Sequence, residues 1–138
     1  MNSLRVVTLL SVAVLTGCGL YESMGGVPHA ERKLAVPAGT QSELIFNCAE
    51  GSIRSLPEPS NWNKEITKKD LQSGVMEVGS FDEENVIGFR ARVMVNDEGT
   101  SIAIKVKGAG PYYTDLGVDS AADKLLEAMK KCLAVQRK

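Results

Sequence analysis

Few side chains in this sequence are of the types that carry out chemistry. The 138 residues include three cysteines, Cys18, Cys48 and Cys132, and a single histidine, His29. A cysteine thiolate can act as a nucleophile, ligate a metal or pair into a disulfide. His29 follows a glycine-rich stretch, where a solvated side chain is a simpler interpretation than a metal ligand. The chemistry of this chain is therefore expected to lie in its three thiols.

Cys18 stands at the end of an apolar N-terminal segment. Residues 1–5 carry one positive side chain, and residues 6–15 are almost continuously apolar. This run is too short to span a bilayer core, which needs about 20 apolar residues, and is typical of a secretion signal. Its end, Leu15-Thr16-Gly17-Cys18, resembles the lipobox of bacterial lipoproteins. The resemblance implies that residues 1–17 are a cleaved signal peptide and that Cys18 becomes a lipidated, palmitate-bearing N-terminus.

Such a lipid would attach the mature chain to a membrane. Several acyl chains, at about 0.8 kcal/mol for each buried CH₂, give stable anchoring. In sorting that resembles that of enterobacteria, an Asp after the lipidated Cys retains a lipoprotein in the inner membrane, and here the position is Gly19. We therefore expect the outer membrane, at its periplasmic face or the cell surface. Residues 18–32, including His29, then form a flexible tether, and residues 33–138 form a single domain.

Cys48 and Cys132 remain as an even pair. Exported proteins meet an oxidising compartment, in which disulfides persist. Both residues fall on the apolar faces of expected helices. We expect a Cys48–Cys132 disulfide between those helices, with two buried reduced thiols as the alternative. A redox-active pair is not indicated, because the chain has no Cys-X-X-Cys spacing.

Apolar periodicity predicts two helices. Apolar residues recur at helical spacing over residues 41–56, and Thr40 and Glu43 have the spacing of a capping box. A second helix is expected from Asp119 or Ser120 to near the C-terminal end, with an apolar stripe that includes Cys132.

Alternating apolar and polar residues predict about four antiparallel strands between the helices. They cover residues 62–67, 75–81, 86–95 and 100–107, and a weaker signal covers residues 33–37. One apolar and one charged face predict a two-layer α+β domain, a meander with both helices packed on its apolar face. This order resembles that of small helix-grip domains in periplasmic lipoproteins, including those of the outer-membrane β-barrel assembly machinery. The resemblance implies the fold and carries no motif for function.

Two parts of the domain are candidates for partner contact. Tyr112 and Tyr113 follow Gly-Ala-Gly-Pro in the loop of residues 108–116, where no regular period accounts for them. Aromatic residues on loops are common contact residues, although a bend from sheet to helix is the simpler interpretation. Arg90 and Arg92 are expected on the charged sheet face with Lys105 and Lys107, a face that is often merely solvated.

Other classes of function have little support in the sequence. Without residues 1–17 the chain has 15 basic and 17 acidic residues, and this balance argues against nucleic acid. No catalytic, cofactor or metal-binding constellation stands out, and residues 82–85 lack the ligand spacing of a calcium loop. We therefore expect neither an enzyme nor a bound cofactor or metal.

The leading hypothesis is an outer-membrane lipoprotein whose non-catalytic domain binds another envelope component, a protein or a glycan, in an accessory or assembly role. The alternative is an inhibitor or small-ligand binder. Phe46-Asn47-Cys48 resembles the opening of lipoproteins that inhibit lysozyme, which also have a cysteine near each end. Those inhibitors are β-barrels, whereas here both cysteines fall in helical patterns.

Overall fold

A computed structural model describes residues 27–56, 61–83, 87–108 and 117–136. The elements are, in chain order, β1 (His29–Ala35), α1 (Ser42–Ser55), β2 (Ile66–Asp70), β3 (Val75–Val78), β4 (Arg90–Val95), β5 (Ser101–Lys107) and α2 (Val118–Val135). The lipobox with Cys18 and the two loop tyrosines lie outside the described residues.

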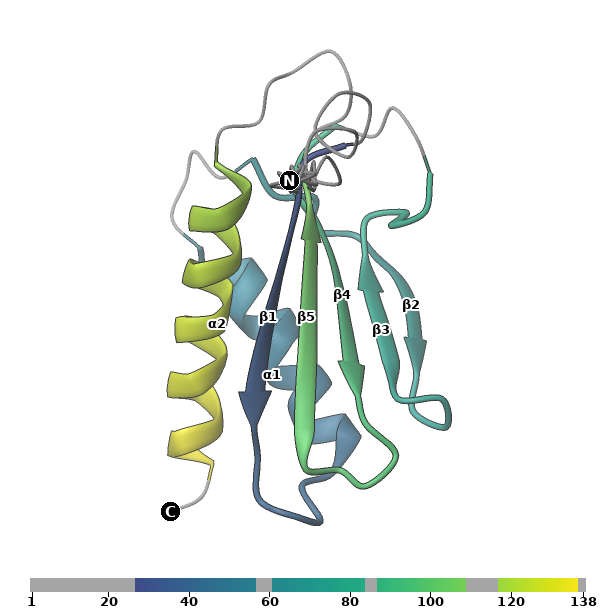
Figure 1. Ribbon diagram of the computed structural model, residues 1–138, viewed down its shortest axis with the longest axis vertical. Coiled ribbons are helices and arrows are strands. Elements are labelled where there is room, and N and C mark those ends of the chain that lie inside the picture. The colour runs from purple at the N-terminus through teal and green to yellow at the C-terminus, as the bar shows by residue number, and fades with distance from the viewer. Residues whose placement is uncertain (1–26, 57–60, 84–86, 109–116, 137–138) are drawn as a thin grey trace, which may run out of the picture.

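The strands form one sheet with both helices on one side of it. The five strands are ordered β1-β5-β4-β3-β2, and every neighbouring pair is antiparallel. Figure 1 views the sheet from its outer face, with α1 behind it and α2 beside β1. The predicted two-layer α+β architecture is confirmed, with five strands instead of about four.

The core lies between the sheet and the helices. Helix α1 buries Ile45, Phe46, Ala49 and Ile53, spaced to lie on one helical face. The inward residues of β3, β4 and β5 alternate with outward ones, as the pleat requires. The fully buried members of the core from the sheet and α2 include Met76, Val93, Ile102, Ile104, Val106, Leu125 and Met129.

The first strand corrects the boundary expected between tether and domain. Strand β1 begins at His29 and pairs with β5 through Ala35, so His29 is an exposed strand residue and not part of a tether. The sequence pattern concealed this strand because Arg32 occupies an inward position between Ala30 and Leu34. Its guanidinium binds Asp119 and Asp123 of α2, and this pairing allows a charge on the helix side of the sheet.

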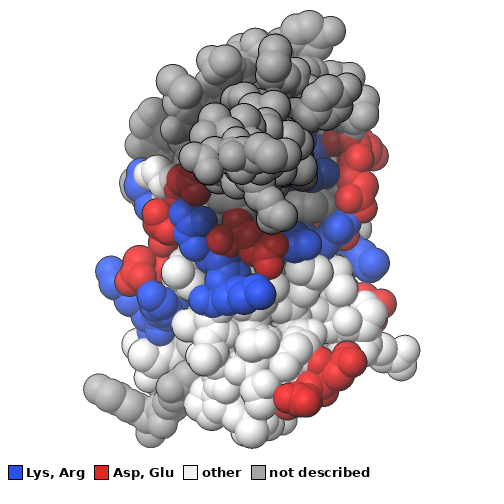
Figure 2. Space-filling view, in the orientation of Figure 1, with Lys and Arg blue, Asp and Glu red and all other residues white. Residues whose placement is uncertain are grey.

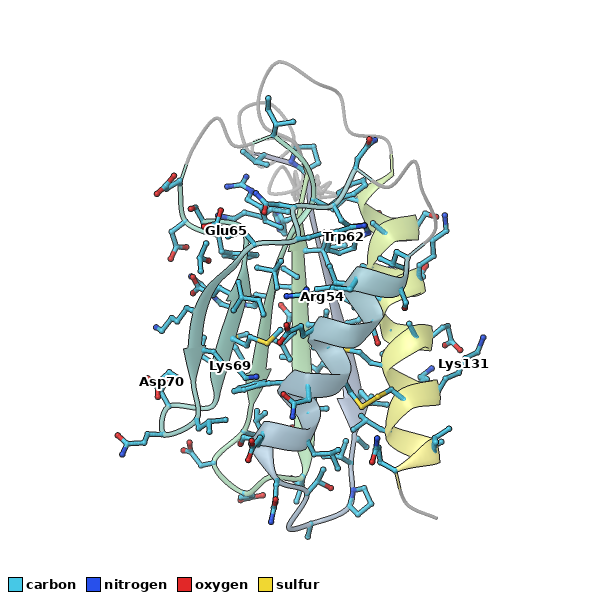
Figure 3. The ribbon with its side chains drawn as sticks, turned by 180° about the vertical axis from the view of Figure 1, so that it is seen from behind. Arg54, Trp62, Glu65, Lys69, Asp70 and Lys131 are labelled. Atoms are coloured by element: carbon cyan, nitrogen blue, oxygen red, sulfur yellow. A yellow bond between two sulfur atoms is a disulfide. The ribbon has the colours of Figure 1, made fainter. Side chains whose placement is uncertain are left out.

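The strand expected at residues 62–67 is displaced along the chain. Strand β2 covers Ile66–Asp70, and Trp62 instead makes an isolated bridge with Phe89. Lys69, which was expected in a connection, points to the helix side, where its Nζ donates to Asn47 Oδ1 of α1 at 2.9 Å (Figure 3). The long apolar stem of lysine can lie along the sheet while its charged end reaches a polar partner, so an apolar pattern does not reveal this strand position.

The strand expected from residue 86 begins at Arg90. Before it, the Phe89 N–H donates to Asn61 O at 2.6 Å, so the chain is held by another segment and not by the ladder. Gly88 has a φ of 93°, and an added Cβ would lie 2.6 Å from Asn61 O. Ile87, an apolar residue near the start of the expected strand, is 80% exposed.

The expected capping box does not form at the start of α1. The N-cap is Gln41 and makes no side-chain cap bond, while Thr40 Oγ1 donates to Pro37 O at 2.6 Å. Thr40 thus stabilises the preceding turn, an alternative that threonine hydroxyls often adopt.

The expected disulfide joins the two helices. Cys48 of α1 and Cys132 of α2 are bonded, and their Cα atoms lie 5.6 Å apart. Figure 3 shows a disulfide as a yellow bond between the two helices. Cys48 is almost fully buried. The bond crosslinks the helix layer at a separation of 84 positions in the sequence.

Candidate functional site

The register of the sheet places a row of charged residues across its outer face. In this row each residue is the Cα partner of the next, and the row comprises Lys68, Glu77, Arg92, Lys105 and Glu31. Figure 2 shows the result as a band of mixed blue and red across the middle of the outer face. We refer to these five residues as the charged row.

The centre of the charged row is an ion-paired arginine. Arg92 Nε lies 2.8 Å from Glu77 Oε1, and Arg92 Nη2 bonds to Asp82 Oδ2. Burial lowers the pKa of Arg92, but the hydrogen bonds to Asp82 and Glu77 outweigh burial, and the net pKa lies above its ordinary value. Arg92 therefore remains a cation that is already held by two carboxylates.

The segment after β3 folds over the upper part of this face. Phe81 is 4% exposed, with the guanidinium carbon of Arg92 at 4.4 Å from its ring centroid and the Lys107 Nζ at 4.6 Å. Lys107 Nζ also donates to the Phe81 carbonyl oxygen at 3.0 Å. Phe81 thus has two cations within cation–π distance of its ring, a favourable placement for an aromatic side chain.

Arg90 lies on the outer face, as expected, but it is fully buried. Its guanidinium donates to the carbonyl oxygens of Ser80, Phe81 and Glu83, and to that of Gly108 at 3.4 Å. Burial lowers its pKa, partly offset by the carboxylates of Asp82 and Glu83. This corrects the expectation of a surface residue, because the segment of residues 80–83 covers Arg90 and removes it from contact with a partner.

Phe81 and Asp82 were not recognised from the sequence as part of this site. The sequence did contain an indication of this placement. In the strand that begins at Val75, every second residue points to the same face of the sheet, and these residues are Val75, Glu77, Gly79 and Phe81. The alternation therefore places Phe81 on the same face that was expected to carry Arg90 and Arg92. Gly79, with a φ of 65°, then lets the chain turn beside Asn63, where an added Cβ would lie 2.7 Å from that side chain.

The free part of the site is the lower half of the outer face. The Lys105 side chain is 44% exposed, and its Nζ is 3.9 Å from Glu31, too far for a strong bond. Below the charged row, Val75, Met94 and Ala103 are partners in register and half-buried. Figure 2 shows this lower region as largely uncharged. An accessible lysine beside a small apolar strip is an arrangement suited to contact with a partner.

Two hollows of the described surface lie elsewhere. One of about 290 Å³ is lined by residues 37–41 with Leu44 and Leu133, and one of about 270 Å³ lies near Ser42, Gln72 and Asn96. Among the described ranges, no group of three His, Cys, Asp or Glu side chains could hold a metal ion. In the same part of the chain no helix has the length and apolarity needed to cross a membrane.

Comparison with known proteins gives no relative from which function could be transferred. Neither a protein-family model nor a curated protein matches this sequence. The function must therefore be inferred from the residues and their geometry.

Proposed function

We propose that this chain is a lipoprotein anchored in the bacterial outer membrane through Cys18, and that its domain binds another envelope component, a protein or a glycan, without catalysis. The role is that of an accessory or assembly factor. The binding part rests on one observation, an outer sheet face that neither helix covers and that presents Lys105 beside Met94 and Ala103.

Export is supported by a feature independent of the N-terminal segment. The Cys48–Cys132 disulfide belongs to proteins of oxidising compartments, because cytosolic reductants keep such thiols reduced. The charged row also fits a polar partner, since all five of its residues are half-buried or exposed. The alternative of a lysozyme inhibitor has no support in the fold, because those proteins are β-barrels and this sheet is covered by two helices.

Anchoring is tested by the thiol that takes the lipid. Cells that produce the Cys18→Ser chain should incorporate no fatty-acid analogue into it, and the product should leave the membrane fraction or retain residues 1–17. The matched control is the Cys48→Ser/Cys132→Ser double variant, which should still be labelled because those two thiols are used for the disulfide. A labelled Cys18→Ser chain would overturn the lipoprotein assignment.

Binding is tested by photo-crosslinking in cells. A photoreactive amino acid at position 105 should give a discrete crosslinked product with an envelope protein or glycan. The same amino acid at position 131, an exposed position on α2 labelled in Figure 3, should give none. No product from position 105, or equal products from both positions, would contradict binding through the outer face.

A further inference from the structure

The two edges of the sheet differ in how they are protected. Strand β2 is five residues long, carries Lys68 and Lys69, and has a register shift between Ile66 and Lys68. Short length, lysine and a bulge are the features by which proteins keep an edge strand from pairing with other chains. Strand β1 also carries a lysine, Lys33, and an inward-pointing charge, Arg32, but it is seven residues long and pairs with β5 without a register shift. No described residue pairs with its other side.

Hydrogen bonds at the ends of β1 determine which residues turn their backbone to this free edge. The Val36 N–H donates to Thr100 O at 2.9 Å, and the Gly108 N–H donates to Pro28 O at 2.7 Å. Even-numbered residues therefore face β5, and the direction alternates along an antiparallel strand. The residues that present their N–H and C=O groups at the free edge are His29, Glu31, Lys33 and Ala35.

A second copy of β1, added antiparallel, must pair odd-numbered residues with odd-numbered ones. Pairing centred on Arg32 uses the whole strand and places each Glu31 opposite Lys33 of the other copy. The neighbouring allowed registers place Glu31 opposite Glu31, or Lys33 opposite Lys33, and pair fewer residues. Unlike charges directly opposite stabilise a strand pair and like charges destabilise it, so the two Glu31–Lys33 pairs favour the register centred on Arg32, which also places the two Arg32 residues opposite each other.

Charges on the helix side fit the same two-fold arrangement. Arg32 Nη2 lies 3.0 Å from Asp119 and Arg32 Nε lies 2.6 Å from Asp123, so each arginine at the two-fold axis already has two carboxylate partners. Leu126 and Lys130 continue the helical stripe of Asp119 and Asp123. In an antiparallel pair of α2 helices, Leu126 would face its own copy and Asp123 would lie toward Lys130 of the other chain.

We propose that the protein forms a two-fold symmetric homodimer by antiparallel pairing of β1 with β1 of a second copy, with Glu31 opposite Lys33 on the outer face and the α2 helices side by side. The sheets then form one continuous sheet, and the free backbone groups of β1 are satisfied. The dimer does not depend on the proposed anchoring or on the proposed envelope partner.

The test is the mass of the full-length chain, purified in detergent and measured by light scattering with the detergent contribution subtracted. The parent protein should have the mass of two chains. Lys33→Glu and Glu31→Lys each place like charges opposite at two symmetric positions, and should raise the dimer dissociation constant by about 10- to 100-fold. The double variant Glu31→Lys/Lys33→Glu exchanges the charges, restores unlike pairs and should regain the parent mass.

A matched control lies on the opposite edge. Lys68→Glu makes the same change of charge on the outer face of β2 and should leave the dimer mass unchanged. Circular dichroism checks that every variant is folded. A parent chain that has the mass of one chain up to its solubility limit overturns the proposal, and so do single variants that remain dimeric or a double variant that does not recover. These outcomes leave labelling through Cys18 and crosslinking from position 105 unaffected, so the proposals fail separately.

Discussion

Removing the disulfide should cost the domain a large share of its stability. The Cys48–Cys132 bond closes a loop with a sequence separation of 84. For a loop of this length, the chain entropy removed from the unfolded state corresponds to roughly 4 to 5 kcal/mol. Because native strain and residual structure in the unfolded chain reduce such values, we expect a measured loss of about 3 to 5 kcal/mol. The melting temperature of a domain of this size would fall by roughly 20 °C.

The measurement is guanidinium unfolding of a soluble form that starts at Gly19, with and without reductant. The double variant Cys48→Ala/Cys132→Ala should resemble the reduced parent and should not respond to reductant. The dependence of the unfolding free energy on denaturant should also rise on reduction, because the uncrosslinked chain exposes more surface when unfolded. A loss below about 1 kcal/mol would refute the crosslinking argument. Free alkylation of both thiols in the native oxidised protein would refute the bond itself.

Three further outcomes are expected. Phe81→Ala should lower the free energy of unfolding by about 3 kcal/mol, the lower end of the range for buried aromatic residues, since this ring contacts Arg92 and Lys107. Urea denaturation measures this loss, and Phe81→Leu is the conservative control. A loss below about 0.5 kcal/mol would contradict the packing of Phe81. The hydrogen bond from Arg32 holds the pKa of Asp123 below its usual range. The stability from this pair is therefore fully present above the unfolded-state pKa of about 4 and is lost as pH falls through the lower folded-state pKa. The difference in unfolding free energy between the parent and Arg32→Gln should accordingly shrink in acid, and a difference that is constant with pH would contradict this. Tyr112→Ala and Tyr113→Ala should each change the free energy of unfolding by less than about 0.5 kcal/mol and weaken partner binding by about 1 to 2 kcal/mol. Melting curves and binding titrations measure these two effects. A large loss of stability in both variants would contradict a role of the two tyrosines in partner contact.

Local patterns in the sequence were enough to predict the layers and the crosslink. Strand β5 alternates Ile102, Ile104 and Val106 with polar residues, and all three are fully buried on the helix side. A period of two determines which side of a sheet a residue faces, and a period of 3.6 determines a helical face. Since Cys48 and Cys132 fell on apolar faces of helices that had to cover the same sheet, their bond followed from the same patterns.

Only the tertiary structure decided the placement and burial of two charged residues, Arg32 and Arg90, that lie where the apolar patterns are interrupted or end. Arg32 lies in β1 because Asp123, 91 positions away, comes near it, and nothing in the sequence beside Arg32 indicates that partner. Arg90 was placed on the correct face, but its burial depends on carbonyl oxygens of residues 80–83, which Gly79 turns back over the sheet. Alternation along a strand reports the direction of a side chain. Whether that side chain meets water or another segment depends on contacts between residues far apart in the chain, because exposure is a property of the folded surface.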